Sequence, residues 1–261
     1  MEWMNRTYFD VPVTTVLFDF DGTISTLRRG WEEVMEPLMV ELLGEDSRAA
    51  VQKYIDESTG IQTIFQMKWL SEKVRARGVN AADPWEYKAE YNRRLMNSVM
   101  ERRQKVVSGI SSPEEFMIKG SRKLLEMLTE NGITLYVASG TDDADVKQEV
   151  AVLGLEKYFK QIKGAPETRE DCSKEAVIRA LIEEKGVEGN RLAVVGDGRV
   201  EIAIGKENGA RTLGLASDEV KLCGINPIKR KRLVDAGADV IAGDFENTAA
   251  MRDFFFGERD L

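Results

Sequence analysis

The segment 14–25, which reads TTVLFDFDGTIS, constrains the fold of this 261-residue chain more than any other stretch. Its apolar run 16–18 is followed by the turn residue Gly22, and this pattern predicts a buried strand that runs into a loop. Asp19 and Asp21 stand two residues apart at the strand end, so we expect both carboxylates to project to the same side. In an open α/β sheet, binding sites form at this end of the strands.

Two later segments repeat this design. The apolar run 133–138 predicts a strand that ends at Ser139, followed by Gly140. The run 192–195 predicts another, which ends at Asp197, and Glu201 follows four residues later. Strand patterns that alternate with helix patterns indicate an α/β fold with a doubly wound parallel sheet. We therefore expect these polar groups to meet at one edge of that sheet.

Lys174 lies in the first turn of an amphipathic helix expected from residue 173 onward. A cation at a helix N-terminus opposes the helix dipole, so this lysine is expected to have a role other than helix stability. A solvent-exposed lysine is the alternative interpretation, and Lys163 is the second candidate for an active-site lysine.

These motifs together resemble the haloacid dehalogenase (HAD) superfamily of phosphohydrolases. The sequence Asp-Phe-Asp-Gly-Thr at 19–23 resembles its first motif, Ser139 its second and Lys174 its third. The segment 196–201 resembles the fourth, although Glu201 stands where an aspartate is commoner. The resemblance implies a Rossmann-like core with a helical cap inserted between motifs one and two.

The resemblance also assigns roles. It implies that Asp19 is the nucleophile, which forms an aspartyl-phosphate, and that Asp21 is the general acid and base. Ser139 would hold phosphate oxygens, and Lys174 would balance the charge of the nucleophile and the phosphoryl group. The further residues expected to bind phosphate or substrate are Gly22, Thr23, Gly140, Gln62 and Thr63.

The charges predict a metal ion. Asp19, Asp21, Asp197 and Glu201 cannot all stay ionised close together without a cation. Oxygen ligands beside a phosphate favour Mg²⁺, which would offset the repulsion and bridge to a phosphate oxygen. By the resemblance, Asp21 would bind this ion through its backbone carbonyl.

Residues 26–112 separate the first two motifs and are too many for an ordinary connection. Helical periodicity from Trp31 to Leu43, another apolar pattern at 61–70 and a Pro84 helix start predict at least three helices there. We expect a cap domain at 26–112 and a catalytic core made of 1–25 and 113–261. The polar turn at 58–63 could enter the active site or simply join two helices, and Arg28 and Arg29 could meet a second anionic group or be solvated.

Composition excludes several classes of function. The chain has no histidine, which removes Ser-His-Asp and Cys-His catalysis and histidine-based zinc sites. A net charge of −8 argues against a nucleic-acid backbone as partner, and the basic run 229–232 is expected to be a solvated helix face. No apolar run spans a membrane and no signal peptide is evident, so we expect a cytoplasmic protein with a small phosphorylated metabolite as its partner.

The leading hypothesis is a Mg²⁺-dependent phosphatase of small phosphomonoesters, because Asp21 supplies the acid that a poor leaving oxygen needs. A sugar phosphomutase of the same superfamily is the alternative. A non-catalytic phospho-aspartate signalling protein is a different class, disfavoured by the Asp-x-Asp pair and the long insert. The polar turn at 58–63 favours a hydroxylated substrate such as a sugar phosphate, and the sequence leaves the oligomeric state open.

Overall fold

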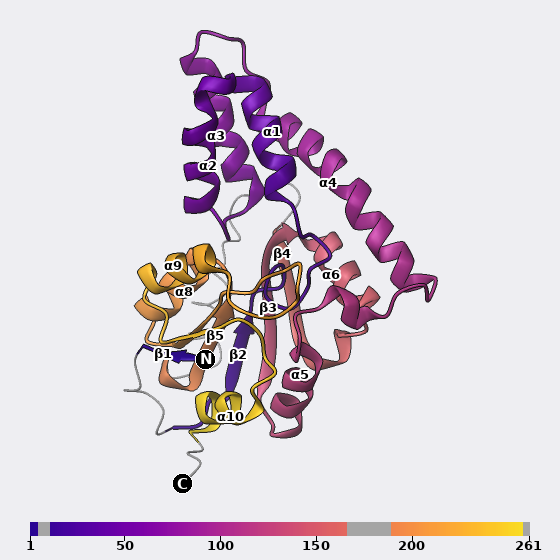
Figure 1. Ribbon diagram of the computed structural model, residues 1–261, viewed down its shortest axis with the longest axis vertical. Coiled ribbons are helices and arrows are strands. Elements are labelled where there is room, and N and C mark those ends of the chain that lie inside the picture. The colour runs from indigo at the N-terminus through magenta and orange to yellow at the C-terminus, as the bar shows by residue number, and fades with distance from the viewer. Residues whose placement is uncertain (5–10, 166–188, 258–261) are drawn as a thin grey trace.

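A seven-stranded sheet forms the centre of the chain in the computed structural model, which describes residues 1–4, 11–165 and 189–257 (Figure 1). The strand order is β1-β7-β6-β5-β2-β3-β4, and all neighbouring strands are parallel except the antiparallel pair β1 and β7. The strands are β1 Glu2–Trp3, β2 Thr15–Phe18, β3 Thr134–Asp142, β4 Phe159–Ala165, β5 Leu192–Gly196, β6 Arg211–Leu215 and β7 Val240–Ala242. This arrangement confirms the predicted α/β class with a mostly parallel sheet.

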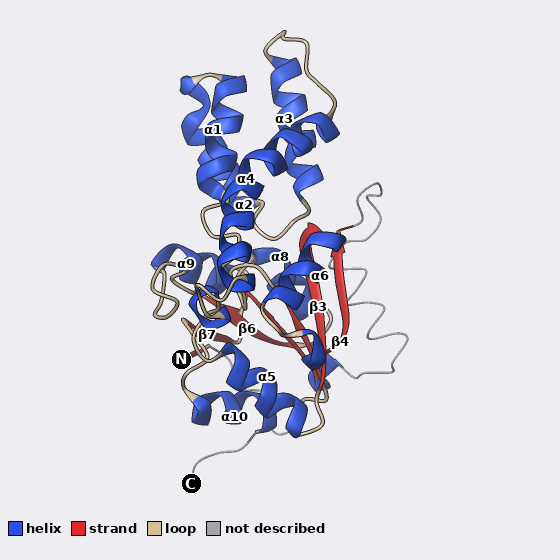
Figure 2. Cartoon of the chain, turned by 90° about the vertical axis from the view of Figure 1, so that its right-hand side faces the viewer, coloured by secondary structure: helices blue, strands red, loops and turns tan. Residues whose placement is uncertain are grey.

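Helices cover both faces of the sheet, so all four residues of its central strand β2 are buried (Figure 2). Val16 and Phe18 pack with apolar residues of α5, α6 and α10, whereas Leu17 points the other way and packs with α8. Alternate residues of one strand therefore serve two separate apolar layers. In the described part of the chain, the helices of this core are α5 Ser121–Glu130, α6 Asp143–Val152, α8 Arg199–Glu207, α9 Pro227–Asp235 and α10 Thr248–Phe256.

The strands at the two edges of the sheet, β4 and β1, were not predicted. β4 has Lys160, Gln161 and Lys163 among its seven residues, and it lies at the edge of the sheet, where polar side chains remain in contact with solvent. β1 has only two residues and pairs with β7 near the N-terminus. Neither strand has the continuous apolar run that marks a central strand.

Four helices between β2 and β3 form a separate unit above the sheet (Figures 1 and 2). They are α1 Glu32–Leu43, α2 Arg48–Glu57, α3 Thr63–Ala76 and α4 Pro84–Val107. Their apolar faces form one cluster that includes Met39, Leu70 and Leu95. This cluster is separate from the two apolar layers that flank the sheet. The predicted helical insertion is confirmed, but its second helix, α2, was missed because its apolar face is narrow, with Val51 and Ile55 as its buried residues.

The long helix α4 begins where the sequence predicts. The Asp83 side chain accepts a hydrogen bond from the backbone N–H of Trp85 at 2.9 Å, and Pro84 occupies the first turn, where its missing N–H costs nothing. The helix continues past the predicted pattern to Val107. It thereby reaches from the cap down beside α6 of the core.

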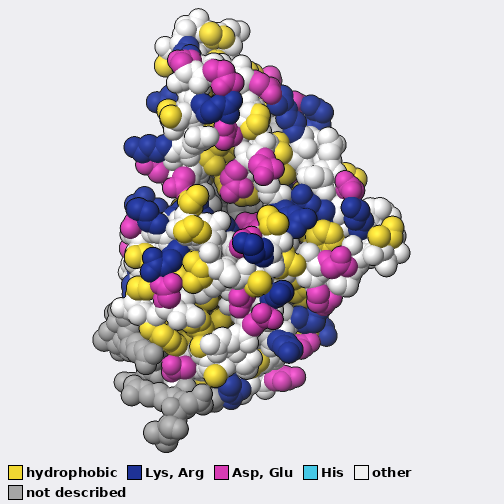
Figure 3. All heavy atoms as spheres, in the orientation of Figure 1, with side chains coloured by type: hydrophobic (Ala, Val, Ile, Leu, Met, Phe, Trp, Pro, Cys, Tyr) yellow, Lys and Arg dark blue, Asp and Glu magenta, His cyan; other side chains and the backbone are white. Residues whose placement is uncertain are grey.

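The surface shows no large area of one charge on the face seen in Figure 3, where acidic and basic side chains alternate over both the cap and the core. No helix in the described part of the chain is both long enough and apolar enough to cross a membrane.

Candidate active site

Strand register brings the motifs together. Phe18 at the end of β2 is aligned with Val137 of β3 on one side and Val195 of β5 on the other. Asp19, Ser139 and Asp197 follow these residues by one or two positions, so all three lie at the same edge of the sheet. Each of the three is only 7% exposed.

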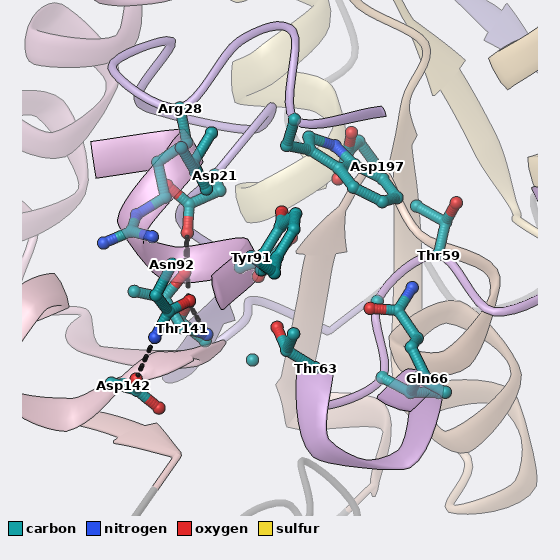
Figure 4. A pocket seen from close by; sticks show the side chains of 17 residues that line it. Asp21, Arg28, Thr59, Thr63, Gln66, Tyr91, Asn92, Thr141, Asp142 and Asp197 are labelled. Atoms are coloured by element: carbon teal, nitrogen blue, oxygen red, sulfur yellow. Dashed lines mark hydrogen bonds between the residues drawn. The ribbon is translucent and has the colours of Figure 1, made fainter. Parts of the chain in front are cut away.

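Asp21 is held by the second motif. Its Oδ2 accepts a hydrogen bond from the hydroxyl of Thr141 at 2.8 Å (Figure 4). It also accepts one from the hydroxyl of Ser139 at 3.2 Å. Burial raises the pKa of the Asp21 carboxyl, and Asp197 raises it further, against the opposing effects of Arg28 and the two hydroxyls. A buried carboxyl with a raised pKa keeps its proton to higher pH, as a proton donor must.

Three carboxylates could hold a metal ion. Asp19, Asp197 and Glu201 each offer an oxygen, and these oxygens lie within 4.8 Å of one another. All three residues are buried, where uncompensated negative charge is unfavourable, and oxygen donors suit a hard divalent cation. The donor set therefore fits the metal expected from the sequence. Asp21 Oδ1 adds a buried oxygen without a hydrogen-bond partner in the described structure.

Glu201 has a second, structural contact. Its Oε1 accepts a hydrogen bond from the backbone N–H of Gly198 at 2.7 Å at the start of α8. The side chain of glutamate, which is one methylene longer than that of aspartate, reaches back to the N-terminus of its own helix. Its carboxylate remains within the acidic cluster.

A cavity of about 100 Å³ lies beside these groups, between the core and the cap (Figure 4). From the core it is lined by Asp19, Asp21, Ser139, Gly140, Thr141, Asp142 and Asp197. The other lining residues among those that the structure describes are Arg28, Trp31, Thr59, Gly60, Ile61, Thr63, Gln66, Tyr91, Asn92 and Leu95. Hydroxyl and amide groups are frequent among the latter, so this side of the cavity can hydrogen-bond a polar substrate.

The turn at 58–63 enters the site. Gly60 has φ of +97°, and a Cβ placed on it would lie 2.8 Å from Oε2 of Glu201. A Cβ on Gly140 would lie 3.0 Å from the carbonyl oxygen of Ile61. The cap turn thus packs against Gly140 of the second motif and against the Glu201 side chain of the fourth. The positive φ of Gly60 favours glycine at that position.

Some of the other residues predicted for the site do not line the cavity. Gly22, Thr23 and Gln62 are buried but are not among the residues that line the cavity, whereas Thr63 and Gly140 are. Lys174 lies outside the described residues. Lys163 is half-buried on β4 and does not line the cavity either.

Arg28 is buried and not solvated. Its side chain is 9% exposed and pairs with Glu149 at 2.8 Å and with Asp145 at 3.0 Å, both on α6. The adjacent helix α4 supplies residues that the sequence did not single out. Asn92 donates to Asp142 at 3.1 Å, and Lys88 pairs with the same carboxylate. Lys88 and Asn92 directly follow the buried tyrosines Tyr87 and Tyr91 of α4, and this spacing was the available signal.

The prediction of a solvated basic face at 229–232 was wrong for two of its residues. Lys229 is 7% exposed and its ammonium lies 2.7 Å from Asp197. The Arg232 side chain is 8% exposed and contacts the cap. Only Lys231, whose side chain is 79% exposed, and the half-exposed Arg230 match the expectation. Four successive residues on a helix point in different directions, so a run of like charges does not show which of them are buried.

Two curated relatives align with most of the chain. It is 24% identical over 201 residues to a 5'-nucleotidase of Pseudomonas aeruginosa, covering 77% of this chain and 81% of the relative. It is 25% identical over 195 residues to a phosphoglycolate phosphatase of Rhodospirillum rubrum, covering 74% and 76%.

Solved structures share the fold. A predicted phosphatase from Clostridium acetobutylicum superposes with a TM-score of 0.63 at 18% identity, covering 92% of this chain and 97% of that one. A β-phosphoglucomutase from Clostridium difficile superposes with a TM-score of 0.60 at 15% identity, covering 89% and 92%. A family model for hydrolases of the haloacid dehalogenase-like type matches residues 13–209. The chain belongs to the haloacid dehalogenase-like hydrolases.

Proposed function

We propose that this phosphomonoester hydrolase is a Mg²⁺-dependent phosphatase of small hydroxylated metabolites that works through an aspartyl-phosphate on Asp19. The observation that carries the proposal is the convergence of Asp19, Asp21 and Asp197 at one small cavity that the cap also lines. The family match supplies the reaction class.

The first step would form a covalent intermediate. An oxygen of Asp19 attacks phosphorus while the bond between phosphorus and the ester oxygen breaks. Asp21 gives its proton to the leaving oxygen, which departs as an alcohol. The Ser139 and Thr141 hydroxyls, which both donate to Asp21, keep its carboxyl aimed into the cavity.

The second step would release phosphate. Asp21, now a carboxylate, takes a proton from water as the water oxygen attacks phosphorus. The bond between Asp19 and phosphorus breaks, so inorganic phosphate leaves and Asp19 is regenerated. The cap residues that line the cavity shield one side of the site while the intermediate exists.

Asp19, Asp197 and Glu201, with the backbone carbonyl of Asp21, would hold the Mg²⁺ ion. When bound, this ion neutralises negative charge at the nucleophile and the transferred phosphoryl group. The acidic cluster thereby becomes compatible with an anionic substrate.

The cavity favours a small substrate. A volume of about 100 Å³ is well below the roughly 300 Å³ at which pockets for drug-sized ligands begin, so it suits a phosphoryl group with a short polar chain. Thr59, Thr63 and Gln66 of the cap, with Asn92, offer partners to substrate hydroxyls. A triose- or tetrose-sized phosphate fits this description better than a nucleotide.

Phosphate release from a panel of phosphorylated metabolites with Mg²⁺ tests the proposal. We expect small phosphates such as phosphoglycolate, glycerol phosphate or a tetrose phosphate to give a higher kcat/KM than a nucleoside monophosphate. The folded Asp19→Asn variant serves as the blank. Failure to release phosphate from any member of the panel would refute the proposed activity, and a preference for nucleotides would refute the proposed size class.

A further inference from the structure

Lys229 occupies an unfavourable position unless it has a specific partner. It lies in the first turn of α9, whose N-terminus is capped by Asn226; the cap accepts hydrogen bonds from the backbone N–H groups of Ile228 and Lys229. A cation at this end opposes the helix dipole, and burying an ammonium group costs more still. Some interaction of its side chain must outweigh both costs.

The side chain finds three partners. Its Nζ lies 2.7 Å from Oδ2 of Asp197, 2.6 Å from Oε1 of Glu219 and 3.3 Å from Oγ of Ser217. The two carboxylates, both within hydrogen-bond distance of the ammonium group, offset the cost of its burial. The three contacts satisfy the three donors of the ammonium group.

The same contacts connect two motif loops. Ser217 also donates to the backbone carbonyl of Gly22 at 2.6 Å. A Cβ on Gly22 would come within 2.3 Å of Oδ2 of Asp197, so the first motif packs directly against this carboxylate. Lys229 therefore contacts Asp197 from the side that packs against the first motif. It is not among the described residues that line the cavity.

We propose that Lys229 is a positioning residue for the metal centre: it fixes the rotation of the Asp197 carboxylate, and Glu219 balances its charge. This inference rests on the proposed function, because it concerns the way in which Asp197 faces a divalent cation. A held Oδ2 determines where Oδ1 points, and a ligand that is already oriented loses less conformational entropy when it binds. Lys229 is thus distinct from a catalytic lysine that touches the phosphoryl group.

The double variant Glu219→Gln/Lys229→Met provides the test. It removes one positive and one negative charge together, so the net charge beside Asp197 is unchanged and only the orienting contact is lost. We expect the affinity for Mn²⁺, measured by calorimetry without substrate, to fall by about 10- to 100-fold, the usual effect of losing a partner of a metal ligand. Lys231→Met, on the exposed side of the same helix, should bind Mn²⁺ as the wild type does.

Unchanged or tighter Mn²⁺ binding by the folded double variant would overturn the inference. If the double variant fails to fold, a crystal structure of the wild type with Mg²⁺ decides instead. Lys229 should stay within hydrogen-bond distance of Asp197 in the bound state, and a lysine displaced from Asp197 would contradict its role. A wild type that binds no Mn²⁺ would count against the proposed function itself, which separates the two failures.

Discussion

Asp19 and Asp21 are two residues apart, yet their surroundings suit them to different tasks. Asp19 lies with Asp197 and Glu201 in the cluster that fits a cation, whereas Asp21 is bonded to two hydroxyls and has a raised pKa. The sequence identified both carboxylates because their spacing at a strand end is local information. It did not identify Thr141 as a partner of Asp21, since that contact joins residues 120 positions apart.

Replacement of Asp21 by Asn should affect substrates according to their leaving groups. An alkyl phosphate needs a proton on its departing oxygen, whereas p-nitrophenolate leaves without one. We expect kcat/KM for an alkyl phosphate to fall by roughly 10²- to 10⁴-fold, the usual contribution of a general acid, and kcat/KM for p-nitrophenyl phosphate to fall much less. Steady-state kinetics with both substrates measures this, and equal losses on the two would assign Asp21 a role other than acid.

At the scale of elements, helix α9 shows best what a sequence conceals. Its basic run suggests a solvated face, but Lys229 and Arg232, almost one turn apart, both turn toward Asp197. The direction of each side chain depends on where the helix lies against β6 and the fourth motif, which is tertiary information. By contrast, central strands β2, β3 and β5 were predictable, because burial on both faces requires continuous apolar runs.

Arg232 connects the core to the cap. It donates to Asp56 and Thr59 of the cap at 3.1 Å each, and to the backbone carbonyl of Asp197 at 3.1 Å. Loss of these bonds should loosen the turn that closes the cavity. Hydrogen bonds from a charged group contribute about 1.5–3 kcal/mol, and Asp56 is half-exposed, so we expect Arg232→Gln to lower kcat/KM about tenfold.

The matched control is Arg230→Gln, two residues earlier on the same helix. Arg230 pairs with Glu2 and is half-exposed, so its loss should leave kcat/KM unchanged. Parallel kinetics and thermal unfolding of the two variants make the comparison. If Arg232→Gln keeps wild-type kcat/KM, the contact with the cap turn has no part in turnover.

At the scale of the whole molecule, the site exists only where two units meet. The sheet edge supplies the carboxylates and the cap supplies the polar side chains above them. The sequence predicted both units and their order along the chain, because the long insertion between motifs one and two is visible in the spacing. It could not predict that Trp31 and Tyr91 line the cavity or how small the cavity is, since both depend on how the cap packs onto the core.

Removal of divalent cations tests the acidic cluster as a unit. Treatment with EDTA should abolish phosphatase activity, and added Mg²⁺ should restore it, because three buried carboxylates repel an anionic substrate unless a cation is present. Ca²⁺ should restore little activity, since its looser coordination aims the carboxylate oxygens poorly for in-line attack. Full activity in the chelated enzyme would rule out a metal requirement.

The most direct measurement of the central claim is detection of phosphate on Asp19. The Asp21→Asn variant should accept a phosphoryl group from p-nitrophenyl phosphate but hydrolyse the intermediate slowly, because the second step needs Asp21 to take a proton from water. Acid quenching followed by peptide mass spectrometry should then show a phosphate adduct on the Asp19 peptide, and none in the Asp19→Asn/Asp21→Asn double variant. An adduct on any other residue, or steady turnover by Asp21→Asn without an adduct, would contradict the account.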